Sequence, residues 1–345
     1  GVDMMVAQRG TSTTGLQNAG GVYTIDRFSH RRNGTWSNAQ FKHEQVDSGT
    51  GLFKKALKVT CTTAEGSAAT GDEGVFIGHY LEKQDTVAAF GDGSAEAKSF
   101  TISFYVKASI ATTYVLHLTT HHLSTNKLIY KTFVVNSADT WERKTITFPA
   151  ITNSISTLDG TVADDAMGFQ IHWILDSAPG TKAVDTYQSG TGTYQMPTGV
   201  NPTGFANTLN ATFQLSGVQI EAGTVATDLE HKTFAQELAL CQRYFEKIVV
   251  DQSEIFTFAV NQFGSSGRIP LTFKVTKRSI PTVSIDAAAF DYYKAAGSGS
   301  NGSASFTVNS YSTDTMGISS SGAAASGVFW SHKSADGFVS ADCEL

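Results

Sequence analysis

The sequence predicts an all-β protein: a jelly-roll β-sandwich, then a smaller C-terminal β-sandwich, joined by a single α-helix. Three observations favour this fold class. Segments with the two-residue periodicity of half-buried strands recur along the chain, turn-forming Gly, Ser and Asn separate them, and only one segment has helical periodicity. Strands that follow one another without helices between them form antiparallel sheets rather than βαβ units.

Composition excludes several classes of protein. The chain has 345 residues, a length for two or three domains, and combines 16% charged with 11% aromatic residues, which is typical of a folded chain. The net charge is −6 and the longest cationic run is residues 30–32, so we expect no nucleic-acid partner. No window of about 18 apolar residues occurs, so we expect no membrane insertion. Three widely spaced cysteines indicate neither a disulfide framework nor a cofactor.

The first predicted sandwich occupies residues 1–230. Its clearest strand is 100–107, FTISFYVK, in which every second residue is apolar. Residues 177–208 form a long connection rich in Gly, Thr and Pro, and a connection of that length is usually functional or an assembly contact. Further strands are predicted at 4–8, 23–28, 41–46, 57–62, 75–81, 114–119, 128–135, 144–148, 168–175 and 211–220.

The helical segment spans residues 233–249, within a predicted connecting helix at 231–250. Thr233 and Gln236 have the spacing of a capping box. Its apolar face consists of Phe234, Leu238, Cys241, Phe245 and Ile248. Such a helix packs either on its own chain or against copies of itself at an oligomer axis. For the second case the predicted interface residues are Leu238, Cys241 and Phe245.

The second predicted sandwich, residues 251–345, is a small β-domain. Strands are predicted at 256–263, 269–275, 282–285, 305–309 and 327–330.

Several motifs carry a resemblance to a known family. They are MMVAQRGTS, YTIDRF, FTISFYVK, TWERKTIT, GVQIEAGTVATDLEH followed by ELALCQRYFEK, IPTVSI, and the terminal ADCEL. Together they resemble a family of tailed-phage fibre proteins, over nearly the whole chain. In that family a jelly-roll domain similar to carbohydrate-binding modules precedes the ELALCQRY helix and a small β-domain. Phe28 stands where the family often has tryptophan.

The resemblance implies a virion protein, a tail or capsid fibre that attaches the particle to its host. It implies a homotrimer assembled in the host cytoplasm and displayed outside the virion, whose partners are its own copies, other virion proteins and a host-surface glycan. Two alternatives remain open: a purely structural capsid fibre or decoration protein without a receptor, and a polysaccharide depolymerase.

No catalytic constellation is recognisable, so we predict that the chain is not an enzyme. The acidic pairs Asp72/Glu73 and Asp164/Asp165 are adjacent residues, which point to opposite faces of a strand or into solvent rather than flanking a glycosidic bond. Neither a G-x-S-x-G nucleophile elbow nor a phosphate-binding glycine loop occurs.

Four histidines are candidate metal ligands. His117, His121 and His122 are close in sequence, and His172 is predicted on a neighbouring strand. The other interpretation is that they are solvated or hydrogen-bonded, and we predict no metal site.

Saccharide binding needs an exposed aromatic ring and a few polar partners. The predicted ligand-binding residues are Trp36, in the polar segment RRNGTWSN, and Tyr187 and Tyr194, in the long connection. Packing of these rings at a subunit interface is the alternative.

Overall fold

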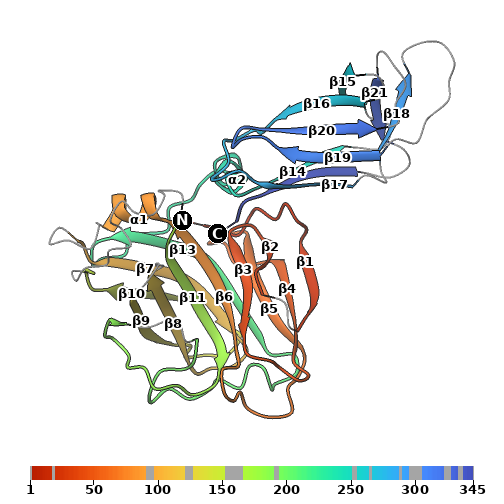
Figure 1. Cartoon of the computed structure of the whole chain (residues 1–345). Helices are drawn as coiled ribbons and strands as arrows, with labels where there is room; N and C mark the ends of the chain where they lie inside the picture. Colours follow the sequence, from red (N-terminus) through yellow and green to blue (C-terminus); the bar gives the residue numbers. More distant parts are fainter. Residues whose placement is uncertain are drawn as a thin grey trace. The chain divides into compact units, whose positions relative to one another are not determined.

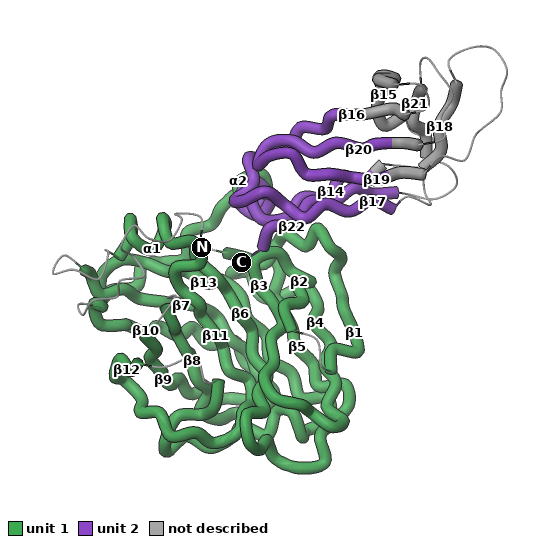
Figure 2. Tube along the Cα trace, in the orientation of Figure 1, with its two compact units in different colours: residues 1–237, 345 green, residues 238–344 purple. Residues whose placement is uncertain are grey.

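The computed structural model forms two compact units, residues 1–237 and 238–344 (Figure 2). It describes residues 2–17, 20–90, 97–120, 127–151, 166–189, 194–250, 255–263, 266–286, 290–294, 305–321, 328–332 and 337–344. Strands dominate these ranges and the helices are short, so the predicted all-β fold is confirmed. No helix in the described ranges has the length and apolar character needed to cross a bilayer.

The first unit is a sandwich of two antiparallel sheets (Figure 1). In spatial order, the six-stranded sheet contains β1 (Ser12–Leu16), β4 (Gln40–Asp47), β5 (Lys55–Thr63), β13 (Thr212–Ala222), β7 (Phe100–Ala108) and β10 (Glu142–Phe148). The seven-stranded sheet contains β12 (Gln188–Ser189), β9 (Lys127–Val134), β8 (Thr113–Thr120), β11 (Met167–Ser177), β6 (Gly74–Glu82), β3 (Phe28–Asn33) and β2 (Val22–Ile25).

The hydrophobic core lies between these two sheets. The core positions predicted in residues 100–107 are confirmed, because Phe100, Ile102, Phe104 and Val106 are fully buried there, although Thr101 and Ser103 on the other face are buried as well. Trp173 of β11 is also fully buried, and its ring meets that of Phe104 edge-on at a centroid distance of 5.7 Å. Aromatic rings therefore link the two sheets.

Two predictions for the first unit are wrong. Residues 4–8 form no strand, and the first strand is β1, which was not predicted. A helix that was not predicted, α1 (Lys83–Phe90), follows β6. It has no apolar stripe, and it is held by Phe90, whose ring packs at 4.7 Å from Phe100 and 5.8 Å from Phe169. A single anchoring ring leaves no periodic signal in a sequence.

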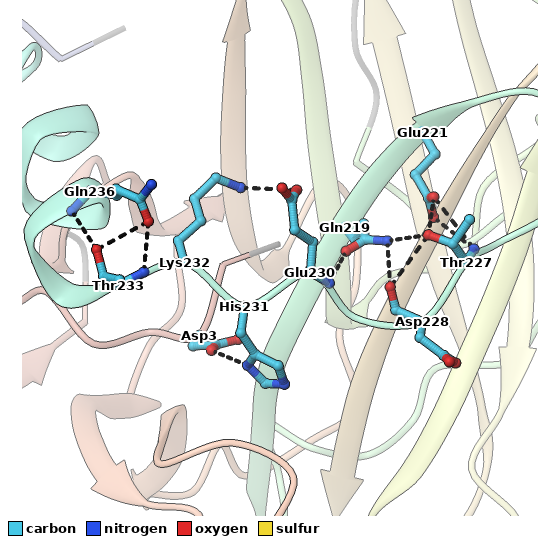
Figure 3. A network of polar contacts seen from close by, with 10 residues as sticks. All are labelled: Asp3, Gln219, Glu221, Thr227, Asp228, Glu230, His231, Lys232, Thr233 and Gln236. Atoms are coloured by element: carbon cyan, nitrogen blue, oxygen red, sulfur yellow. Dashed lines mark hydrogen bonds and ion pairs between the residues drawn. The ribbon is translucent and has the colours of Figure 1, made fainter.

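Helix α2 (Phe234–Gln242) begins where it was predicted to begin but ends early. The capping box is confirmed: the Gln236 N–H donates to Thr233 Oγ1 at 3.3 Å, and the Thr233 N–H donates to Gln236 Oε1 at 2.9 Å (Figure 3). The second half of the predicted helix is instead strand β14 (Phe245–Val250). Six consecutive pairings with β22 (Gly337–Asp342) outweigh the helical spacing of the apolar residues.

The end of helix α2 is fixed by a buried ion pair. Lys277 Nζ donates to the carbonyl oxygen of Gln242, the last helical residue, and to Glu246 Oε2 at 2.7 Å. The side chains of Lys277 and Glu246 are both essentially unexposed. A cation at the carbonyl end of a helix is favourable, and here it also neutralises the first buried acid of the following strand.

The segment before helix α2 is tied to the first unit by polar contacts (Figure 3). The backbone N–H of Glu230 donates to Gln219 Oε1 of β13 at 2.7 Å, and Gln219 Nε2 donates to Thr227 Oγ1. His231 Nδ1 lies 2.8 Å from Asp3 Oδ2. Residues 223–233 therefore follow the sandwich surface as an ordered segment rather than a free linker.

The second unit contains two antiparallel sheets, as its strand pattern predicted. The three-stranded sheet has the order β14, β22 and β17 (Thr282–Ile285). The six-stranded sheet has the order β18 (Phe290–Lys294), β21 (Val328–His332), β15 (Ile255–Phe263), β16 (Ser266–Thr272), β20 (Thr315–Ser321) and β19 (Ser305–Ser310).

Candidate functional site

The seven-stranded sheet carries a second packed face, which we call the outer face because it points away from the core. On β6 the core-facing residues Val75 and Ile77 alternate with the outer-facing Phe76, Gly78 and Tyr80. The strand register places Ser29 of β3 on one side of Gly78 and His172 of β11 on the other, and His172 pairs with His117 of β8. Side chains from four adjacent strands therefore meet on this face.

The long connection after β11 covers part of the outer face. It folds back through backbone bonds such as Met196 N–H to the Ala178 oxygen, at 2.8 Å. Its apolar residues pack on the sheet in a second cluster that contains Phe76, Val115, Leu128, Tyr130, Ile174 and Met196, with Val184, Tyr194 and Val200 partly buried against them. This cluster has no residue in common with the main core, so it forms a second apolar layer on the outer face of the sheet.

Tyr194 stands at the border of the covered area. Its ring stacks on Phe76 at a centroid distance of 4.4 Å, and it meets the His172 ring edge-on at 5.0 Å. Its backbone oxygen accepts a hydrogen bond from Ser177 Oγ at 2.6 Å, which fixes the position of the ring. Tyr194 remains partly exposed, and so do Arg31 and Gln170 on the uncovered side.

His117 and His172 form a hydrogen-bonded pair. Their Nδ1 atoms are 3.3 Å apart, whereas the ring centroids are 5.5 Å apart with planes inclined by 17°. The difference between the two distances is about two ring radii, so the nitrogens face each other along the line between the rings. One imidazole donates its Nδ1–H and the other accepts.

The orientation of the two rings fits a hydrogen bond between them. Their Nδ1 atoms face each other along the line between the rings, so they point at one another rather than toward a common third point. In the described part of the chain, no group of three or more His, Cys, Asp or Glu side chains is placed to hold a metal. His121 and His122 lie outside the described residues. Burial lowers the pKa of His117 to about 3, so the pair is neutral at pH 7.

Polar atoms converge above Gly78, on the uncovered side. A Cβ atom at residue 78 would lie 2.8 Å from Tyr80 Oη and 2.9 Å from Ser29 Oγ, so only glycine leaves room for these two hydroxyls. The Arg31 Nε–H donates to Ser29 Oγ at 3.2 Å, and the guanidinium carbon lies 4.9 Å from the centre of the Tyr80 ring. We call Ser29, Arg31, Tyr80 and Gln170 the polar group of the outer face.

The chemistry of this arrangement suits binding rather than bond cleavage. A guanidinium and hydroxyls are oriented by aromatic rings, which is how proteins hold hydroxylated ligands. Burial raises the pKa of the Tyr80 phenol, against the opposing effect of the Arg31 cation, so the phenol remains a protonated donor.

The predicted ligand residues have different positions. Trp36 is 1% exposed, with its Nε1–H directed to the Gly74 oxygen at 3.4 Å, so its prediction as an exposed platform is wrong. The indole is buried although the segment around it is polar, so sequence polarity alone does not reveal its position. Tyr187 is partly buried against the main core and donates its hydroxyl to the Pro149 oxygen at 3.0 Å. Of the three, Tyr194 alone contributes to the outer face.

The predicted interface residues are mostly covered within one chain. Cys241 and Phe245 are 2% and 6% exposed, and Phe245 belongs to strand β14 rather than to the helix. Their assignment to an intermolecular face is therefore wrong for this fold. Leu238 is partly exposed, and Phe234, one turn earlier on the same face of α2, is 55% exposed.

The polar group of the outer face was not predicted from the sequence. Its signal was the segment 75–81, which is apolar on both faces of a strand with a glycine in the middle. A strand of an antiparallel sandwich usually has one solvated face, so apolar residues at nearly every position indicate a second packed surface.

No known family model matches the sequence, and no curated protein matches it. Among solved structures, the chain is similar to a family 4 carbohydrate-binding module, with 18% identity, 52% of this chain and 88% of that chain covered, and a TM-score of 0.29. A family 11 carbohydrate-binding module from Clostridium thermocellum, in complex with a mixed-linked tetrasaccharide, is 14% identical over 64% of this chain and 99% of that one, with a TM-score of 0.29.

A third similar structure is the enzymatically active domain of tailspike protein 4 from bacteriophage CBA120. It is 8% identical, covers 57% of this chain and 19% of that chain, and has a TM-score of 0.31. At these TM-scores the likenesses carry no inference about function, so the proposals below depend on the geometry of this chain.

Proposed function

We propose that the chain is an attachment protein that binds a cell-surface saccharide on the outer face of its seven-stranded sheet. The observation that carries this proposal is the polar group beside Tyr194. Arg31, Gln170 and Tyr194 are each partly exposed, and they lie on the same face of the sheet as the buried rings of Phe76, Tyr80 and His172. A saccharide offers apolar C–H faces to such rings and hydroxyls to such polar atoms.

We further propose that the chain acts as a trimeric tail or capsid fibre of a virion, displayed toward the host, as the motif resemblance implies. Helix α2 supports a role in assembly. Phe234 and Leu238 lie four residues apart, on the same side of the helix, and both offer apolar surface that a second copy would cover.

The binding proposal is tested with the isolated protein on an array of microbial and host-surface glycans. We expect binding that Tyr194→Ala weakens at least tenfold, because the ring that orients the site is lost. Tyr187→Ala is the matched control, since it removes a similar ring from the same connection without touching the outer face. Equal loss in both variants, or no binding to any glycan, contradicts the proposal.

Catalysis is tested on the same glycans. Release of shortened saccharides from an array member that binds would favour a depolymerase over a binding protein. A protein that binds no glycan and still assembles into the virion would have a purely structural role.

Assembly is tested by analytical ultracentrifugation. Leu238→Asp is expected to convert trimers to monomers, because a carboxylate cannot be buried unpaired. Ala239→Asp, about 100° around the helix from Leu238, adds the same charge at an exposed position and should leave trimers intact. Trimers that persist in both variants would show that α2 is not the contact.

A further inference from the structure

The polar group of the outer face contains an unneutralised cation. Arg31 has its Nε–H on Ser29 Oγ and its guanidinium over the Tyr80 ring, and no carboxylate among the described residues pairs with it. A partly buried guanidinium retains its charge, and it is usually placed against a carboxylate or phosphate.

A second guanidinium–tyrosine contact on the same sheet provides a comparison. The Arg9 guanidinium lies over the Tyr23 ring at 5.2 Å, but its Nη1 is also 3.8 Å from Asp26 Oδ1. Arg9 therefore has an internal counter-ion, and the carboxylate of Asp26 also accepts a hydrogen bond from the Gln8 N–H at 3.2 Å. The contact between Arg31 and Tyr80 has the same kind of cation and ring, but no carboxylate among the described residues takes the place that Asp26 has beside Arg9.

The other ionisable groups around Arg31 do not supply the missing negative charge. His172 is neutral at pH 7, because burial, the neighbouring His117 and the Arg31 cation each lower its pKa. Burial raises the pKa of Tyr194, which keeps that phenol protonated. Glu82 lies two residues beyond Tyr80 on β6, where it is fully buried and accepts a hydrogen bond from Gln84 Nε2 at 2.7 Å.

From this arrangement we infer that the saccharide bound on the outer face carries an acidic group, and that the Arg31 guanidinium binds it. The inference depends on the proposed saccharide-binding function and adds the class of sugar: a uronate, sialate or other anionic residue. Nε and the aromatic contact orient the guanidinium, which leaves its terminal nitrogens to form the paired bonds that a carboxylate accepts. Because the overall charge of −6 repels an anionic ligand, a local cation such as Arg31 favours its binding on this face.

The test uses pairs of polysaccharides that differ only in charge. Polygalacturonate, hyaluronan and polysialate are each compared with their carboxyl-reduced forms, in which a hydroxymethyl group replaces the carboxylate. We expect the wild-type protein to bind at least one acidic form about tenfold or more tightly than its reduced partner, the value of a charge-assisted hydrogen bond.

Variants separate the role of Arg31 from that of charge in general. Arg31→Gln should remove the preference for the acidic form, and Arg31→Lys should restore only part of it. Arg32→Gln removes the same charge from the next residue of β3, which points to the opposite face, and should retain the preference. Circular dichroism and thermal unfolding establish that each variant is folded.

The outcomes distinguish this inference from the proposed function. Binding that is equal for acidic and reduced forms, or a preference that survives Arg31→Gln, overturns the inference and leaves saccharide binding intact. Binding to none of the acidic, reduced or neutral glycans overturns both. A preference lost equally in Arg31→Gln and Arg32→Gln reflects general charge attraction and also overturns the inference.

Discussion

The two faces of the seven-stranded sheet are built from the same strands but differ in the side chains that they carry. The core face consists mainly of aliphatic and aromatic side chains that interlock with the second sheet. The outer face has a paired histidine, hydroxyls and a cation without a counter-ion among the described residues, covered in part by a loop connection. Apolar packing explains the first arrangement, whereas the second places polar groups where stability alone does not require them.

Buried imidazoles occur on both faces. Their protonation gives the largest expected effect, a dependence of the free energy of unfolding on pH. Burial lowers the pKa of His30 to about 4 and those of His79 and His117 to about 3, and it lowers those of His43 and His172 well below the usual value. Below pH 6.5 the unfolded chain binds protons that the folded chain does not. The free energy of unfolding therefore falls as the pH drops from about 6.5 toward 4.

Five such groups give a loss on the order of 7 kcal/mol per pH unit, since each contributes about 1.4 kcal/mol. Asp176 and Glu237, whose pKa values are raised by burial, act in the opposite direction but are two groups against five. Denaturant titrations between pH 7 and 4.5 measure the slope. Replacing His30 and His43 by leucine should reduce it by about two fifths. A flat stability profile over this range would contradict the assignment of these histidines as neutral in the fold.

The second-largest expected effect is the loss of stability when one aromatic ring on each face is replaced by alanine. Phe104 is fully buried and packs against Phe133 and Trp173, so Phe104→Ala should cost about 3–5 kcal/mol. Tyr194 is partly exposed, so Tyr194→Ala should cost less, about 1–2 kcal/mol, for the loss of its stacking on Phe76. Denaturant unfolding at neutral pH, followed by tryptophan fluorescence, measures both. Equal costs would mean that the outer face is a second structural core.

Substitution of Gly78, which lies close to the hydroxyls of Tyr80 and Ser29, should give a smaller change in stability. Gly78→Ala brings a methyl group to less than 3 Å from Tyr80 Oη and Ser29 Oγ, so we expect a loss of about 1–3 kcal/mol and displacement of the phenol. Saccharide binding should fall by more than the stability does, because the displaced groups belong to the site. Gly66→Ala, where a Cβ meets nothing within 4 Å, is the matched control. Unchanged binding by Gly78→Ala would place the ligand elsewhere.

Sequence periodicity predicted the core face well and the outer face poorly. Alternation in residues 100–107 identified core positions because burial on one side repeats every second residue. Trp36 was misplaced because its burial depends on contacts with residues distant in the chain, such as Gly74. Arg31 gave no local signal. Whether it has a counter-ion depends on side chains from four strands, and these strands are neighbours only in the folded sheet.

Helix α2 illustrates the same limit. Its start depends on a side chain three residues away and was predictable, whereas its end depends on Lys277 and on pairing with β22, both remote in sequence. Hydrogen bonds between residues close in sequence can be predicted from the sequence, whereas those between residues far apart in the chain cannot.

Replacing the Arg31 cation is expected to produce the smallest change in stability. An apolar side chain of similar length removes a partly buried charge that has no acidic partner, so Arg31→Met should leave the free energy of unfolding unchanged or raise it by about 0.5–1 kcal/mol. Arg32→Met on the same strand controls for general effects of charge. Denaturant unfolding measures both. Because a residue retained for stability would lose stability when replaced, a cost above about 1 kcal/mol for Arg31→Met would make the outer face a structural feature and remove the main reason for regarding it as a binding site.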